Sequence, residues 1–173
     1  MEEFRGWKSC DWESFPRTKR GHDELVRRLK KIIRSEYGLR LVKFDRKEAS
    51  VAERHGYKSH HYVAHEPDLV IADREGAENR IFVEYVNTLG NDLGNFIRDL
   101  RGMLSLSTIV KSYRGFVLAV RDSAFHASWC TNLPRDSPLE IMSLKSLLFA
   151  LDKKDLAYLV GKSDLRGASG KKG

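Results

Sequence analysis

The segment PDLVIADREGAENRIFVEYVN, residues 67–87, constrains the fold of this chain more than any other stretch. Its first part, from Asp68 to Ala72, is an apolar run with one carboxylate at its start. Its second part, from Arg80 to Asn87, carries Glu84 inside a run of Val, Ile, Phe and Tyr. The residues between them are charged and include a glycine, as hairpin loops do. The segment therefore predicts two short neighbouring strands.

The two carboxylates of this segment have two possible roles. Burying Glu84 among apolar residues costs free energy unless its charge finds a partner. A divalent cation shared with Asp68 is one such partner, because Mg²⁺ takes oxygen ligands from one or two carboxylates. In the structural alternative, Asp68 closes a turn after Pro67, and Glu84 pairs with an Arg or Lys at a sheet edge. The residues alone leave both roles open.

Composition limits the class of protein. The 173 residues fit one domain with a single core, and 41% apolar with 32% charged residues indicate a globular chain. No apolar run approaches the ~20 residues of a membrane span, and the N-terminus lacks the apolar core of a signal peptide. Cys10 and Cys130 form no CxxC pair, so neither a disulfide framework nor a thiolate zinc site is indicated. We expect a cytoplasmic protein.

The formal net charge of +7 favours polyanionic partners, of which nucleic acid is the commonest soluble one. Candidate phosphate contacts lie in the Lys- and Arg-rich stretch 17–34 and in a histidine-rich stretch. They include Arg17, Lys19, Arg20, Lys58, His60 and His61. A solvated surface is the alternative. His55, His60, His61 and His65 lack a cysteine or an HExxH pattern, so we expect them to face DNA or solvent rather than to bind zinc.

Apolar periodicity divides the chain into elements. It predicts helices over residues 22–37, ended by Gly38, and 93–111, with Asn91 or Asp92 as N-cap. Glu36 and Ile97 fall on the apolar faces of these two helices. Strands are predicted at 39–44, 115–121 and, at a sheet edge, 139–142, besides the two above. Residues 45–60 are expected to be a loop with a helical turn at 48–53.

The remaining segments complete the organisation of the chain. Residues 143–160 predict an amphipathic helix that caps the core or forms a dimer interface. Residues 1–20 form an N-terminal extension, 21–160 the domain, and 161–173 a flexible basic tail. The order predicts an α/β fold with a central mixed sheet flanked by helices. Three antiparallel strands come first, then a crossover helix and a strand parallel to its neighbour.

The element order and the motifs Pro67-Asp68 and Glu84-Tyr85-Val86 resemble the PD-(D/E)XK nuclease superfamily, with its restriction-endonuclease-like αβββαβ core. Within it the chain looks most similar to archaeal Holliday-junction resolvases, whose first helix carries a run like Glu24-Leu-Val-Arg27. The resemblance covers about residues 20–121. It implies a Mg²⁺- or Mn²⁺-dependent DNA endonuclease, with branched DNA as a candidate substrate and a homodimer as the candidate assembly. Asp68 and Glu84 would be catalytic metal ligands.

Two positions depart from the family pattern. Val86 stands where the family has its catalytic lysine, so Arg98, or else Arg101, of the following helix is expected to supply the charge. Arginine stays protonated and would be a poor proton acceptor. The metal-binding glutamate of the resolvases falls on His22 here, and Glu24 is the expected substitute.

These departures leave two other interpretations. One is a catalytically inactive nucleic-acid-binding or assembly protein on the same fold, and the other is an unrelated α/β domain in which the motifs are accidental. Convergence of Asp68 and Glu84 in one cleft would argue against the accidental motifs. Neutralisation of Glu84 by a buried arginine would argue against the nuclease.

Overall fold

A computed structural model describes residues 8, 10–37, 39–55, 58–63, 65–72, 80–87, 94–111, 113–126, 133 and 136–152. For residues 51–55 and 58–63 it describes the backbone only. Among these residues no helix has the length and apolar character that crossing a bilayer requires.

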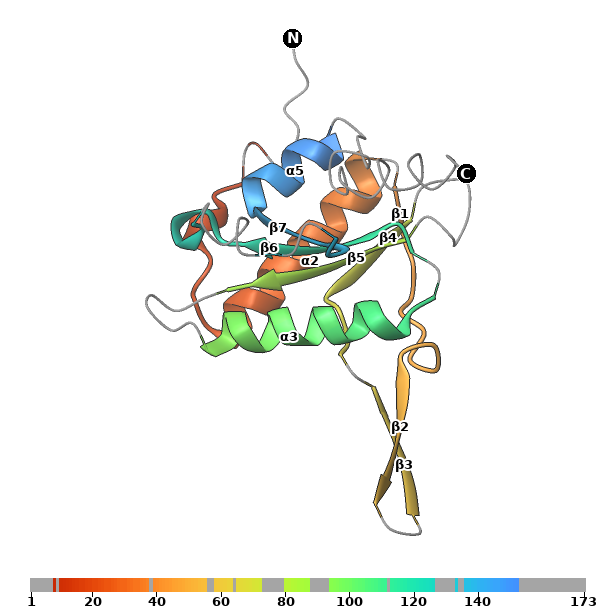
Figure 1. Ribbon diagram of the computed structural model, residues 1–173. Coiled ribbons are helices and arrows are strands. Elements are labelled where there is room, and N and C mark those ends of the chain that lie inside the picture. Colours follow the sequence, from red (N-terminus) through yellow and green to blue (C-terminus); the bar gives the residue numbers. More distant parts are fainter. Residues whose placement is uncertain are drawn as a thin grey trace.

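A mixed five-stranded sheet lies at the centre (Figure 1). Its strands, in spatial order, are β1 (Arg40–Leu41), β4 (Leu69–Ala72), β5 (Arg80–Val86), β6 (Gly115–Val120) and β7 (Leu139–Ser143). β1, β4 and β5 pair antiparallel, whereas β5, β6 and β7 pair parallel. The predicted α/β class with a mixed central sheet is confirmed, including the edge strand at residue 139.

Helices cover both faces of this sheet, so the molecule has three layers (Figure 1). α3 (Gly94–Ile109) lies on one face, and α2 (Lys19–Glu36) and α5 (Leu144–Asp152) lie on the other. Short 3-10 turns, η1 (Trp12–Ser14) and η3 (Asp122–Ala124), complete the described helical elements. α5 buries Leu147 and Leu151 in the core, and thus caps it as one of the two sequence interpretations proposed.

Side-chain alternation along β5 determines where Glu84 lies. Val83 and Tyr85 join the apolar cluster beneath α2 and α5, whereas Phe82 and Val86 join the cluster beneath α3. Because successive residues of a strand point to opposite faces, Glu84 shares the α3 face with Phe82 and Val86. A carboxyl therefore lies inside the apolar layer between β5 and α3.

A two-stranded hairpin that the sequence did not predict extends away from the three layers (Figure 1). It consists of β2 (Ser50–His55) and β3 (Lys58–Val63), paired antiparallel with Val51 opposite Tyr62. The predicted loop with a helical turn at residues 48–53 is wrong. These strands contain few apolar residues, so they lack the period-2 apolar pattern by which a half-buried strand is recognised.

Three smaller expectations are also corrected. The strand expected at 39–44 is regular only at Arg40–Leu41. Ile97, expected on the apolar face of α3, is 42% exposed, and Glu36 is exposed at the end of α2. The expected helix caps at Gly38 and at Asn91 or Asp92, the helix beyond Asp152 and the basic tail lie outside the described residues.

Candidate metal-binding site

Asp68 and Glu84 meet where β4 and β5 begin to separate. The last pairs of these strands include Leu69 with Val83, so Asp68 and Glu84 follow as the next opposite residues. Asp68 precedes β4, and its Oδ2 accepts a 2.7 Å hydrogen bond from the backbone N–H of Tyr85. The carboxylate of Asp68 thereby takes the place of a backbone acceptor at the end of the strand pair.

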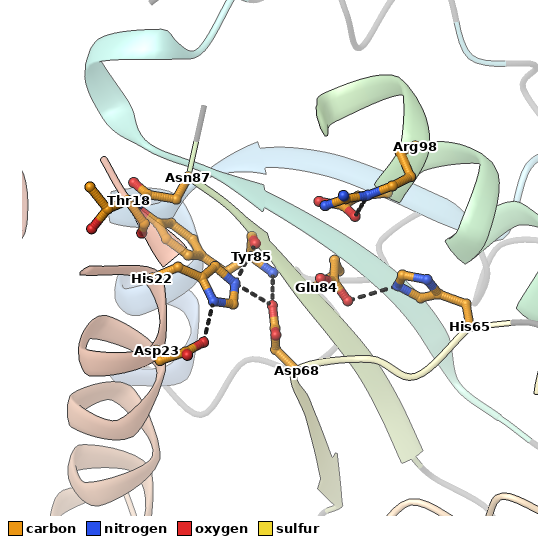
Figure 2. Close-up of polar contacts among 10 residues, drawn as sticks. Thr18, His22, Asp23, His65, Asp68, Glu84, Tyr85, Asn87 and Arg98 are labelled. Carbon is orange, nitrogen blue, oxygen red and sulfur yellow. Dashed lines mark hydrogen bonds and ion pairs between the residues drawn. The ribbon is translucent and has the colours of Figure 1, made fainter. Parts of the chain in front are cut away.

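The N-terminus of α2 brings His22 to this pair (Figure 2). Thr18 caps the helix by accepting a hydrogen bond from the N–H of Gly21, and Asn87 donates to the carbonyls of Pro16 and Thr18. The first turn of α2 is thus fixed to the end of β5. Nε2 of His22 lies 3.1 Å from both Asp68 Oδ2 and the carbonyl oxygen of Tyr85.

His65 and Asp99 approach Glu84 from the other side. Nε2 of His65 lies 2.8 Å from Oε2 of Glu84 (Figure 2). Asp99 projects from α3 and is 7% exposed, while Glu84 is 6% exposed. The ring of His65 packs directly on Gly102, where a Cβ atom would lie 2.3 Å from Nδ1 of His65. A glycine in α3 therefore makes room for the imidazole.

These residues form two groups of possible metal ligands that share Glu84. His22, Asp68 and Glu84 make one group, and His65, Glu84 and Asp99 make the other. Within each group one ligand atom per residue lies within 4.8 Å of the others. Carboxylate oxygens suit hard cations such as Mg²⁺ and Mn²⁺, and imidazole nitrogen suits transition metals. The donor set thus fits a divalent cation.

The electrostatics of the metal-free cluster show how much negative charge is concentrated in it. Burial, together with the charges of Asp68 and Asp99, raises the pKa of Glu84 to about 10. Burial also raises the pKa of Asp99 and lowers that of His65. The contact between Glu84 and His65 therefore fits a neutral carboxyl group whose O–H donates a hydrogen bond to a neutral imidazole.

His22 carries positive charge in the same cluster. Its hydrogen bond with Asp68 raises its pKa to about 9, against the opposing effect of burial. Nδ1 lies 3.1 Å from Oδ1 of Asp23, so both ring nitrogens face acceptors. In the metal-free cluster, a proton on His22 and a proton on Glu84 thus reduce the net negative charge of the carboxyl groups. A bound divalent cation would take the place of these two protons.

A hollow of about 450 Å³ opens over the cluster and carries several cations on its lining. Glu84, Asp99 and His22 line it together with Arg17, Lys19 and Arg98. Arg98 is 73% exposed, and its Nε lies 3.4 Å from Oδ1 of Asp99. The hollow thus places positive charge, which attracts a phosphate group, beside ligands that suit a divalent cation.

The structure brings together some predicted site residues and separates others. Asp68 and Glu84 meet in one ligand group, and Arg98 lines the hollow beside Glu84, whereas Arg101 does not line it. Glu24 does not join either described ligand group; its Oε1 pairs with Arg20 at 3.1 Å. Arg20 is not among the residues that line the hollow with Arg17 and Lys19. The side chains of Lys58, His60 and His61 lie outside the described residues.

Sequence reasoning missed three members of the cluster: His22, His65 and Asp99. His65 was expected to face DNA or solvent, but it contacts Glu84. Asp99 follows Arg98 on α3 and belongs to no sequence motif that would mark it as a site residue. The signal for His22 was its position two residues before Glu24, where the resolvase family has a metal ligand.

Comparisons of the chain with protein-family models, with curated proteins and with solved structures found no match.

Proposed function

We propose that this protein is a metal-dependent nuclease that hydrolyses phosphodiester bonds in DNA. One observation carries the proposal: Asp68 and Glu84, the two carboxylates of the sequence motif, converge with His22 in a group that fits a divalent cation. Such convergence argues against accidental motifs. In the described structure Glu84 is paired with His65 and not with a buried arginine.

The residues of the cluster suit this chemistry. Either His22, Asp68 and Glu84 or His65, Glu84 and Asp99 would hold Mg²⁺ or Mn²⁺. The cation would lower the pKa of a bound water and neutralise charge on the phosphate. Arg17, Lys19 and Arg98 line the same hollow, so they would bind the phosphate group and stabilise the negative charge that develops on its oxygens. In the net reaction water adds to phosphorus, the P–O bond to the leaving sugar breaks, and its oxygen takes a proton.

A second candidate function is binding of nucleic acid without cleavage. Val86 stands where the resembled family has its lysine, and it is 1% exposed within the apolar cluster beneath α3. Position 86 therefore supplies no positively charged side chain to the site. Arg98 would then bind phosphate without assisting proton removal.

Cleavage of end-labelled linear duplex, single-stranded and four-way-junction DNA tests the proposal. The assay is run with Mg²⁺, with Mn²⁺ and with EDTA, and compares the wild type with Glu84→Gln and with Glu36→Gln, an exposed control that lines neither described hollow. We expect metal-dependent cutting that Glu84→Gln reduces at least about a hundredfold and Glu36→Gln leaves intact. Salt-sensitive binding without cutting of any substrate would instead support the second candidate. Whether the enzyme acts as a two-fold dimer is part of the same proposal and is read from its mass in solution.

A further inference from the structure

A second hollow beside α2 is lined by positively charged side chains that do not line the hollow of the candidate site. It has a volume of about 420 Å³ and lies between α2, the residues after β1 and the start of β4. Lys30 and Arg34 line it from α2, and Lys43 lines it from the segment after β1. Asp68 lines it as well, so this hollow reaches the metal-ligand cluster.

The cations of this hollow are available for an anionic ligand. Within the described part of the chain, Lys30, Arg34 and Lys43 form no ion pair with a carboxylate. Glu66, also on the lining, has Arg46 3.9 Å away as its counter-charge. Several cations that share one concave surface and have no acidic partners raise the local concentration of anions.

The geometry of α2 connects this hollow with the cluster. Residues four apart along a helix form a continuous ridge, and His22, Val26, Lys30 and Arg34 make up one such ridge. His22 contacts Asp68 at one end of the ridge. Lys30 lies about 12 Å further along the helix axis, and Arg34 lies about 6 Å beyond it. The ridge therefore leads from the cluster into the second hollow.

We propose that Lys30, Arg34 and Lys43 bind successive phosphates of the DNA strand whose phosphodiester lies at Asp68 and Glu84. This inference rests on the proposed function for the identity of its ligand, and it adds the course of the strand. Phosphates of a duplex strand follow one another at about 3.4 Å along the duplex axis. For a duplex whose axis lies along α2, the hollow therefore holds those roughly three to five nucleotides from the bond at the cluster.

The proposed course has a consequence for the position of the cut. Arg17 and Lys19 line the first hollow at the N-terminal turn of α2, and Lys30 and Arg34 line the second hollow about three to four turns after Lys19. The strand thus has cationic contacts on both sides of the bond at the cluster. Contacts on both sides suit cleavage within a strand rather than removal of its terminal nucleotide.

A matched pair of double variants tests the inference through binding alone. Lys30→Gln with Arg34→Gln removes two charges from the ridge, and Arg27→Gln with Lys31→Gln removes two charges at the same spacing from exposed positions that line neither hollow. Affinity for a short labelled duplex is measured against salt concentration. We expect the ridge variant to flatten the salt dependence by about two counterions and the control variant to leave it nearly unchanged. Equal effects of the two variants would overturn the inference.

A substrate modification locates the contacts independently. Single methylphosphonate linkages, which are neutral, are placed at each position along one strand. The wild type should lose affinity when the neutral linkage lies three to five nucleotides from the cluster-bound phosphate, and the ridge variant should show no such loss. A ridge variant that responds to every position as the wild type does would contradict the inference. Ridge-specific binding by a protein that never cuts DNA would refute the proposed function and leave the inference standing.

Discussion

Glu84 is the residue at which the demands of folding and of the proposed chemistry conflict. Its carboxyl lies in the layer between β5 and α3, where burial and, next to it, the neighbouring carboxylates raise its pKa to about 10. The metal-free fold therefore favours the neutral form of the Glu84 carboxyl over its ionised form. A divalent cation changes this balance, because it favours the ionised carboxylate.

Removing the acid at this position should stabilise the metal-free protein. Glu84→Gln keeps the size of the side chain and cannot ionise, so at about pH 8 we expect the free energy of unfolding to rise by roughly 1–3 kcal/mol. The exposed control Glu36→Gln should stay within about 0.5 kcal/mol of the wild type. Urea unfolding in EDTA measures both. Destabilisation by Glu84→Gln would show that the wild-type carboxyl is already well compensated without metal.

The same protonation states predict a pH-dependent effect of metal on stability. Glu84 is raised from 4.5 to about 10 and His22 from 6.5 to about 9, so above pH 4.5 the folded state holds more protons than the unfolded chain. The stability of the metal-free protein therefore falls as pH rises toward 9. A bound cation replaces these protons, and the cost of releasing them is smaller at higher pH.

We therefore expect Mn²⁺ to raise the Tm more at about pH 8 than at about pH 6. Thermal melts with and without MnCl₂ at the two pH values measure the difference. In Glu84→Gln the increment should be small at both. An equal increment in the wild type at both pH values would mean that binding of the cation releases no protons.

At the scale of elements, the contact between α3 and the segment before β4 positions His65. Gly102→Ala would place a Cβ atom against the His65 ring and move its Nε2 away from Glu84. We expect this substitution to weaken Mn²⁺ affinity about tenfold. The effect should be much smaller in a His65→Ala background, because the ring that collides with the new methyl group is gone.

Calorimetric titration of the four proteins of this cycle, the wild type, both single variants and the double variant, gives the coupling between the two positions. Additive effects would show that Gly102 acts on metal binding by a route other than His65.

We expect the β2–β3 hairpin to contribute to DNA binding and to add little to the stability of the core. It extends away from the three layers, so shortening it should cost the core little (Figure 1). Replacing residues 51–62 by an Asn-Gly turn between Ser50 and Val63 keeps the pair that closes the hairpin. We expect the Tm to change by no more than a few degrees and the affinity for duplex DNA to fall at least tenfold, because Arg54, Lys58, His60 and His61 are lost.

Melting curves and a gel-shift titration measure the two effects of the shortened hairpin separately. Unchanged affinity would refute the predicted phosphate contacts of Lys58, His60 and His61.

At the scale of the whole molecule, the sequence predicted the layers better than the site. The apolar runs of β4, β5 and β6 and the periodic face of α2 are patterns that burial itself imposes, so they could be recognised without a structure. The hairpin carries no such pattern. His65 and Asp99 reach Glu84 only through tertiary packing, and nothing in their local sequence records that contact.

Glu84 could be found because a carboxylate conflicts with the apolar residues around it, and Asp68 could be found because it follows Pro67 at the start of the neighbouring strand. Glu24 illustrates the limit of motif reasoning: it lies on the partly exposed side of α2 and pairs with Arg20, while His22, two residues earlier, faces the cluster. Residues two apart on a helix point in directions that differ by more than half a turn. Glu24 therefore could not take the place of a ligand at position 22, although the two positions are close in sequence.

Calorimetric titration of Mn²⁺ into the wild type, Glu84→Gln and Glu36→Gln asks whether Asp68, Glu84 and their histidine neighbours hold a divalent cation, and it requires neither a substrate nor cleavage. We predict saturable binding with release of protons in the wild type and in Glu36→Gln, and loss of that binding in Glu84→Gln. Binding that Glu84→Gln leaves unchanged, or no saturable binding by the wild type, would contradict the account.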